Sequence, residues 1–262
     1  MTNLVVENVA KVKGEQSANS LFTCMKRIDF LQSILRKMKI YPRYYKEDLS
    51  YLKLEGLDGI AYPMKCFCDI FLNKLENHMS SYGNYGIALT KEWGVLNKLQ
   101  PVQYINENSS LYSTIQDIYY DNKNKFKYGK KDSFHNIIGF IKPIYGKMPY
   151  DGGVIEKNFH DEKEWRYIPD INPRDRKFFA YIEKPYIINT QDLLDERSNK
   201  FFLKDKYGLK FSADDVRYIM IAAENERELM IDFIIKNCRF PREEKYKLIS
   251  KITILNEMKG DW

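Results

Sequence analysis

The apolar residues of this chain form short segments of helical periodicity and short strand-like runs, and these two kinds of segment follow each other in irregular order. Residues 28–38 repeat Ile, Leu and Met at helical spacing, whereas residues 216–223 form a strongly apolar run rich in residues that favour strands. A doubly wound sheet or a barrel needs strands and helices in regular alternation, and this sequence has none. We therefore predict one α+β domain, with a central mixed or split β-sheet flanked by helices.

Four segments are expected to form strands of this sheet: 87–89, 102–105, 165–168 and 216–223. Ile219 and Ile221 should be buried beside a helix over residues 226–237. A final helix is predicted over residues 242–258, and Asp29 is placed to cap the first helix. These elements are enough to build a sheet with helices on its faces.

The chain of 262 residues is long enough for one large domain or two small ones. We divide it into a loose, flexible polar leader, residues 1–19, and one folded domain, residues 20–262. No segment approaches the roughly 18 consecutive apolar residues of a membrane span, and the N-terminal residues lack the pattern of a secretory signal. We therefore expect a cytoplasmic protein without a membrane partner, whose four cysteines stay reduced.

Positive charge is in modest excess, with a formal net charge of +6. The segments 123–131 and 142–147 interleave lysine with aromatic residues, a combination that can follow a nucleic-acid backbone. A solvent-exposed loop explains the same pattern more simply. Nucleic acid therefore stays an alternative partner.

Two cysteines in one short segment invite comparison with a zinc site. Cys66 and Cys68 are followed by His78, but structural zinc sites place two to four residues between paired cysteines and use two further ligands. We also expect the two thiols to face opposite sides of a strand. The sequence therefore predicts reduced, buried cysteines and no bound metal.

The segment over residues 159–167 is the richest in candidate chemistry. Glu162 and Glu164 are two residues apart, so an extended chain would place both carboxylates on one face, together with Arg166. Such a group can position a sugar hydroxyl or stabilise positive charge at a reacting carbon, such as the ribosyl carbon of NAD. A solvated edge strand with an ion pair is the simpler alternative.

Residues 82–86 read Tyr-Gly-Asn-Tyr-Gly, an aromatic turn with two glycines. Glycine permits backbone angles that let a ligand ring approach the chain closely, and Tyr82 and Tyr85 supply aromatic faces. A tight connection packed under a core Trp93 is the structural alternative.

Together these segments resemble the AbiGi abortive-infection family over roughly residues 20–224. Each motif alone is short, but their combination and order are specific. The resemblance rests on the segments 20–22, 41–44, 63–70, 82–94, 101–104 and 161–169.

The resemblance implies an anti-phage defence protein, the antitoxin half of a two-gene system whose partner is a cognate toxin. It also implies a distant likeness to ADP-ribosyltransferases, in which Glu164 would be the main catalytic residue, supported by Glu162 and Arg166. In such an enzyme NAD would contact three residues: Thr23, Tyr82 and Tyr85.

Two positions depart from the family pattern. Relatives tend to carry proline after the Asp-Ile pair, and this chain has Phe71. Relatives carry histidine after the Leu-Phe pair, where the NAD ribose would lie, and this chain has Thr23. The departure at Thr23 favours a binding or regulatory protein, whereas the intact acidic cluster favours an NAD-dependent ADP-ribosyltransferase; a nucleic-acid-binding protein is the third alternative. A ribosyl-transfer pocket would bring Glu164 into one cleft with Thr23 and with Tyr82 or Tyr85.

Overall fold

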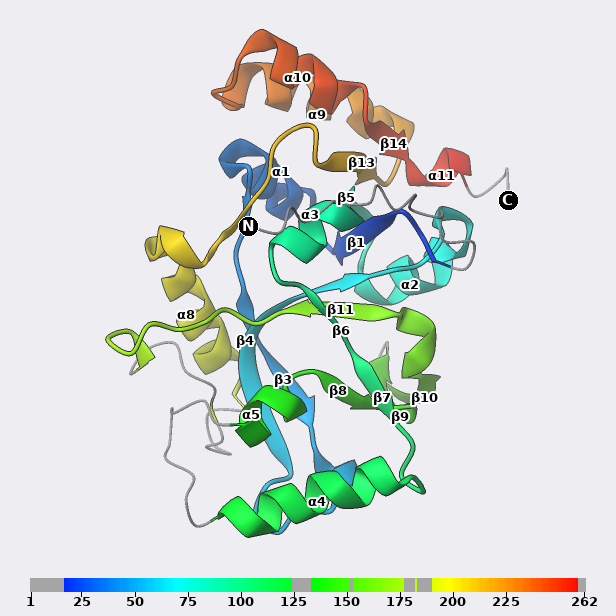
Figure 1. Cartoon of the computed structure of the whole chain (residues 1–262). Helices are drawn as coiled ribbons and strands as arrows, with labels where there is room; N and C mark the ends of the chain where they lie inside the picture. Colours follow the sequence, from blue (N-terminus) through cyan, green and yellow to red (C-terminus); the bar gives the residue numbers. More distant parts are fainter. Residues whose placement is uncertain (1–16, 124–132, 151–152, 177–181, 183–189, 259–262) are drawn as a thin grey trace, which may run out of the picture.

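An eight-stranded mixed β-sheet runs through the molecule, with helices above, below and beside it (Figure 1). The computed structural model describes residues 17–123, 133–150, 153–176, 182 and 190–258. Within these residues the strands are β1 (Ser20–Met25), β2 (Lys39–Ile40), β3 (Arg43–Asp48), β4 (Gly59–Cys68), β5 (Tyr85–Thr90), β6 (Gln100–Pro101), β7 (Gln103–Ile105), β8 (Ile141–Pro143), β9 (Tyr145–Tyr150), β10 (Gly153–Asn158), β11 (Glu164–Tyr167), β12 (Leu209–Lys210), β13 (Val216–Ile221) and β14 (Ile252–Ile254).

The helices are fewer and mostly short. The α-helices of the described residues are α1 (Ile28–Lys37), α2 (Leu75–Tyr82), α3 (Lys91–Leu96), α4 (Ser110–Asn122), α5 (Ser133–Ile138), α8 (Gln191–Asn199), α9 (Arg227–Asn237), α10 (Arg242–Ile249) and α11 (Leu255–Met258). The 3-10 helices are η1 (Ser50–Leu52), η2 (Leu72–Lys74), η4 (Phe159–Glu162), η5 (Lys200–Leu203), η6 (Asp205–Tyr207) and η7 (Glu224–Glu226). In this part of the chain no helix has the length and apolar character needed to cross a membrane.

The strand order of the main sheet is β14-β13-β5-β1-β4-β11-β6, and β3 also pairs with β4. β13 and β14 run parallel, whereas the other pairs of this sheet are antiparallel. The prediction of an α+β fold around a central mixed sheet is therefore confirmed.

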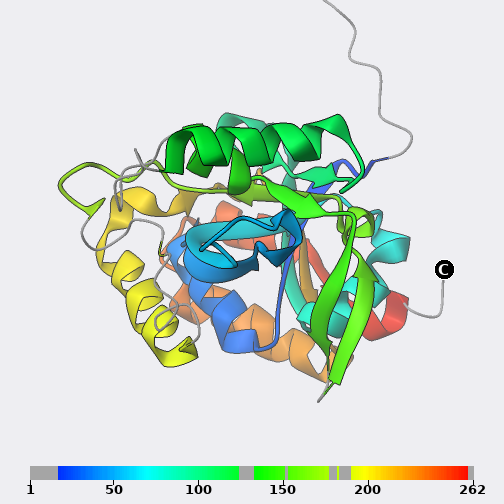
Figure 2. The same cartoon turned by 90° about the horizontal axis from the view of Figure 1, so that it is seen from below.

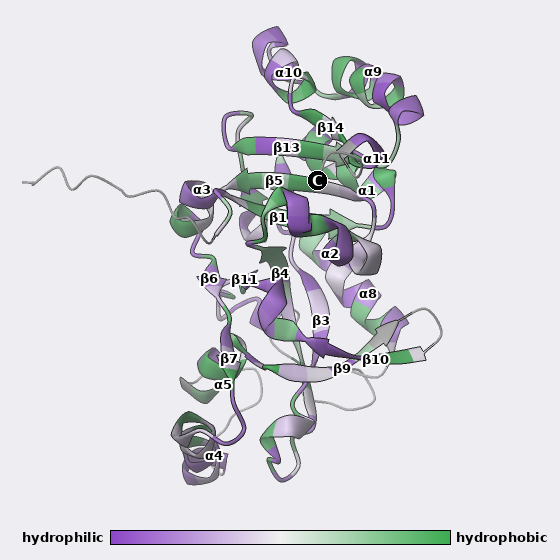
Figure 3. Cartoon of the chain, turned by 90° about the vertical axis from the view of Figure 1, so that its right-hand side faces the viewer, coloured by the Kyte–Doolittle hydropathy of each residue, from purple (hydrophilic) through white to green (hydrophobic). Residues whose placement is uncertain are grey.

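One core lies between β5, β13 and the helices α1, α9 and α10. Ile219 and Ile221 are fully buried and belong to the same hydrophobic cluster as Met230 and Ile234 of α9. Figure 3 shows β5 and β13, largely in the hydrophobic colour, below α9 and α10. The predicted burial of this strand against this helix is confirmed.

A second core lies at the other end of β4. There Tyr62 and Met64 of β4 pack in one cluster with Ile115 of α4 and Ile138 of α5. α4 closes that end of the molecule, as Figure 1 shows. The long strand β4 thus connects the two cores.

β4 changes its partner along its length, and this change opens the sheet. Its first six residues pair with β3 and its last four with β11. With β1 it shares one registered pair, Phe22 with Cys68. In an antiparallel ladder the next pair would be Thr23 with Phe67, but these two residues line a cavity instead. The sheet is therefore split at this point.

Three local predictions were wrong. The strand expected at residues 102–105 forms as β7, but it pairs with β8 in a separate two-stranded sheet and not in the main sheet. Asp29 lies inside the first turn of α1 and pairs with Arg27, and no side chain caps that helix. The predicted helix over residues 242–258 is broken after Ile249, because residues 252–254 form β14 and pair with β13. β-Branched residues in that segment favour the strand once a partner edge is available.

Other predictions fall partly outside the described residues. Residues 1–16 of the predicted leader and residues 124–132 of the basic segment are outside them. Ala18, which follows, is buried and packs in the cluster of Phe22 and Met220.

Candidate functional site

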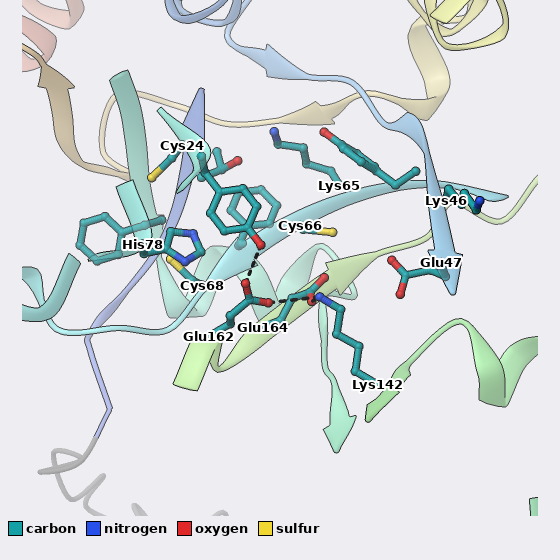
Figure 4. Close-up of a pocket in the computed structure, with 15 residues that line it drawn as sticks. Cys24, Lys46, Glu47, Lys65, Cys66, Cys68, His78, Lys142, Glu162 and Glu164 are labelled. Atoms are coloured by element: carbon teal, nitrogen blue, oxygen red, sulfur yellow. Dashed lines mark hydrogen bonds and ion pairs between the residues drawn. The ribbon is translucent and has the colours of Figure 1, made fainter. Parts of the chain in front are cut away.

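A cavity of about 200 Å³ lies where β1 and β4 separate (Figure 4). β1, β3, β4, α2 and the η4–β11 connection contribute to its wall. The lining residues are Phe22, Thr23, Cys24, Tyr45, Lys46, Glu47, Lys65, Cys66, Phe67, Cys68, His78, Tyr82, Lys142, Glu162 and Glu164.

Glu164 is the best-anchored carboxylate of the cavity. Its Oε1 accepts a hydrogen bond from Arg166 Nε at 2.8 Å, and its Oε2 lies 2.7 Å from Lys142 Nζ. Burial alone would favour the neutral acid, but the two cations outweigh burial and hold the pKa of Glu164 well below its usual range. The group is therefore an ionised, immobilised carboxylate.

Glu162 lies beside Glu164 for a reason that the sequence did not predict. An extended chain over residues 162–166 was expected, but Glu162 ends η4 and Lys163 has a φ of 42°. The two carboxylates meet because Lys142 bridges them, with its Nζ 3.1 Å from Glu162 Oε2. The extended interpretation was wrong for Glu162 and right for Glu164 and Arg166, which share one face of β11.

Two more donors fix Glu162. The hydroxyl of Tyr82 donates to Oε1 at 2.5 Å, and Lys157 Nζ lies 2.6 Å from the same atom. Burial opposes ionisation here too, but Lys142, Lys157 and Tyr82 lower the pKa of Glu162 below its ordinary value.

Arg166 lies beneath the cavity and does not line it. Its side chain is fully buried, and it donates to Glu47 Oε2 at 2.8 Å and to the carbonyl oxygen of Gly139 at 2.9 Å. Together with Glu164 these contacts join β3, β11 and the end of α5. The geometry gives this arginine a structural role.

The buried ion pairs of the site are balanced. Three carboxylates, Glu47, Glu162 and Glu164, face three cations, Arg166, Lys142 and Lys157. Buried charges are tolerated when they are paired and hydrogen-bonded in this way. The network needs no external ion to neutralise its carboxylates.

The structure brings together most of the residues that the sequence singled out. Thr23 and Tyr82 line the cavity with Glu164, as predicted for one shared cleft. Tyr85 does not line it: its hydroxyl donates to Glu226 Oε1 at 2.5 Å, at the edge of the α9 core. Assigning Tyr85 to the same site was wrong, because the turn carries the two tyrosines to different places.

Gly83 explains how the turn separates them. It ends α2 with a φ of 116°, a conformation that favours glycine. A Cβ atom at this position would lie 2.2 Å from the carbonyl oxygen of Met25. The close contact between this turn and the end of β1 therefore requires glycine.

His78 and the three cysteines of the wall are uncharged. His78 packs on Tyr82 with ring centroids 4.4 Å apart, and burial lowers its pKa to about 4. Burial raises the pKa of Cys24 to about 12 and raises the pKa values of Cys66 and Cys68 well above the usual range. These thiols are poor nucleophiles and poor metal ligands in this state.

The expectation that Cys66 and Cys68 face opposite sides was wrong. Residues two apart on a strand share a face, and both cysteines line the cavity. All four cysteines are free, and the described residues contain no cluster of three His, Cys, Asp or Glu side chains that could hold a metal ion.

A second hollow of about 610 Å³ adjoins the first and shares His78 and Glu162 with it. It lies between α2 and the base of the two-stranded ribbon β9–β10, which reaches outward on the side opposite α8 in Figure 2. Met148 and Lys157 of that ribbon contact the Tyr82 hydroxyl and Glu162, respectively, so the ribbon is attached to two residues of the cavity wall.

Sequence reasoning missed the lysines that organise this site. Lys142 was noted only as part of a basic, aromatic segment, and Lys65 was not singled out. Neither lysine belongs to a local motif. Lys142 pairs with Glu162, 20 residues away, and Lys65 has no carboxylate among its electrostatic neighbours.

The sequence matches the family model described as "Putative abortive phage resistance protein AbiGi, antitoxin" over residues 38–222. The chain belongs to the AbiGi family. It is also similar to an abortive phage resistance protein AbiGi from Lactococcus lactis subsp. cremoris, with 38% identity over 256 residues, 86% of this chain and 100% of that relative. No solved structure gives a significant match.

The resemblance to the AbiGi family is thus confirmed. The AbiGi match includes the carboxylates and lysines of the cavity, whereas Thr23 and the rest of β1 precede it. The central strand of the sheet therefore lies outside the segment that defines the family model.

Proposed function

We propose that this AbiGi-family protein takes part in abortive phage infection as an antitoxin, a cytoplasmic regulatory partner that binds a toxin protein. The observation that carries the proposal is the match over residues 38–222 to a family model described as an antitoxin. The Lactococcus lactis relative, which this chain matches over the relative's full length, is likewise named for abortive phage resistance.

The site supports a binding protein more than an NAD-dependent enzyme. Glu164 is held by Arg166 and Lys142, so its charge is already satisfied within the chain. The cavity of about 200 Å³ is below the roughly 300–1,000 Å³ of typical ligand sites, and a whole dinucleotide exceeds it. Thr23 offers only a hydroxyl at the position where the resemblance implies histidine.

Co-expression with the product of the neighbouring gene tests this proposal. We expect the two proteins to co-purify, and we expect this chain to restore growth of cells that express the neighbour alone. Glu164→Gln breaks two buried ion pairs, so its folding is first checked by circular dichroism. The folded variant should leave both results unchanged. Recovery of nucleic acid without a protein partner would contradict the proposal and support the nucleic-acid alternative, to which the net charge of +6 gives modest support.

A second candidate is an ADP-ribosyltransferase-like enzyme. It is favoured by one observation: Thr23, Tyr82 and Glu164 line one cavity. In that reaction Glu164 would orient a ribose hydroxyl and stabilise positive charge on the reacting carbon, and its loss should reduce the rate on the order of 10²-fold or more.

NAD turnover by wild type and by Glu164→Gln separates the two candidates. We expect no turnover by either protein. Turnover by wild type that disappears in the variant would replace the antitoxin proposal with the enzymatic one.

A further inference from the structure

Lys65 brings to the cavity a positive charge that no carboxylate balances. Its electrostatic neighbours among the described residues are Cys24, Cys66 and Arg43, and it forms no ion pair there. Arg43 is itself paired, with Asp195 at 2.7 Å. Because burial raises the pKa values of both thiols, neither supplies negative charge. An ammonium group in such a wall is unfavourable unless a ligand supplies the counter-charge.

The opposite end of the cavity still has hydrogen-bonding capacity. Figure 4 shows Glu162, Glu164 and Lys142 on one side and Lys65 across the cavity from them. Glu162 accepts from three donors, and a carboxylate offers about four acceptor positions. Lys142 uses two of its three N–H groups on the two carboxylates. Each group can therefore make a further bond with a ligand hydroxyl.

We propose that this cavity binds a small hydroxylated phosphate ester, with its phosphate against Lys65 and its hydroxyls at Glu162 and Lys142. A lysine binds phosphate as a point charge. The volume of about 200 Å³ is somewhat larger than the roughly 150 Å³ that accepts benzene, so the ligand has the size of a triose or pentose monophosphate. Phe22 and Phe67 supply an apolar wall.

A bound phosphate would stabilise the charged form of Lys65. Burial lowers the pKa of Lys65, so the empty cavity weakens its charged form. A phosphate beside it restores that form. The carboxylates are neutralised by their own cations, so they do not repel an anion placed across the cavity. This site goes beyond toxin binding and does not depend on it.

Isothermal titration calorimetry on the full chain tests the proposal with four probes: ribose 5-phosphate, glycerol 3-phosphate, ribose and glycerate. We expect both phosphate esters to bind and the uncharged sugar to give no measurable heat. Glycerate, which has hydroxyls and a carboxylate but no phosphate, should bind at least about tenfold more weakly than glycerol 3-phosphate.

Two lysine variants locate the anion. Lys65→Met should weaken phosphate-ester binding at least about tenfold, and it should fold with an equal or higher thermal midpoint because an unbalanced charge is replaced by an apolar chain. Lys26→Met is the matched control, since Lys26 is an exposed lysine that does not line the cavity. It should change affinity by less than about threefold.

Four results would overturn the proposal. The first is that neither phosphate ester binds at concentrations up to about 10 mM, which corresponds to negligible affinity. The second is that ribose or glycerate binds as tightly as its phosphorylated counterpart. The third is that Lys65→Met binds like wild type. The fourth is that Lys26→Met loses as much affinity as Lys65→Met, which would reduce the effect to general surface charge.

Discussion

Replacing Arg166 by methionine should destabilise the protein strongly, because its guanidinium holds two carboxylates from different strands. It contacts Glu164 and Glu47 at 2.8 Å each and the Gly139 carbonyl at 2.9 Å, and it is fully buried. Removing one partner of a buried ion pair costs about 3–5 kcal/mol. Glu164 would keep Lys142, whereas Glu47 would lose its ion-pair partner within the described residues. We therefore expect a loss of about 4 kcal/mol.

For a chain of this size such a loss lowers the thermal midpoint by about 10 °C. Urea and thermal unfolding followed by circular dichroism measure it. Arg27→Ala is the control, because its pair with Asp29 is exposed, with 67% and 49% of the two side chains accessible, and such a pair contributes little to stability. Adding Glu47→Gln to Arg166→Met should recover part of the loss. A cost for Arg166→Met no larger than that of the control would refute the reasoning.

Three further predictions concern the same region. Gly83→Ala should lower the free energy of unfolding by at least about 3 kcal/mol, because the new Cβ would collide with backbone atoms. Gly56→Ala, also at positive φ but in open space, should lower it by about 1 kcal/mol, and urea unfolding compares the two variants. Burial lowers the pKa of His78 to about 4, so the unfolded chain takes up this proton first as pH falls from 6.5 towards 4, and the free energy of unfolding decreases over that window. His78→Gln should flatten this dependence relative to wild type. Elemental analysis of purified protein should find no stoichiometric zinc, because Cys66 and Cys68 are expected to bind no metal.

The sequence predicted the sheet well where apolar runs were long. The strand ending at Ile221 and the helix beside it followed directly from periodicity. β14 has only three residues and is stable because β13 offers it an edge, so no local pattern could reveal it. Short strands depend on tertiary partners in this way.

The candidate site was predicted in part, for a similar reason. The acidic cluster was visible because Glu162, Glu164 and Arg166 are close in sequence. Lys142 joins them from 20 residues away, and Lys65 is recognisable only by the absence of a counter-charge. Both are properties of the folded arrangement, which spacing alone does not encode.

The first strand of the described chain lies in the middle of the sheet, and this order has a consequence for biosynthesis. β1 must wait for β4 and β5, and β5 must wait for β13, which lies some 130 residues later in the chain. Pairings between such distant segments form slowly because long loops must close first. Until β13 has left the ribosome, β5 carries an open apolar edge of the kind that aggregates or recruits chaperones. A chain truncated after residue 215 would therefore be cleared as misfolded protein rather than retained as a working fragment.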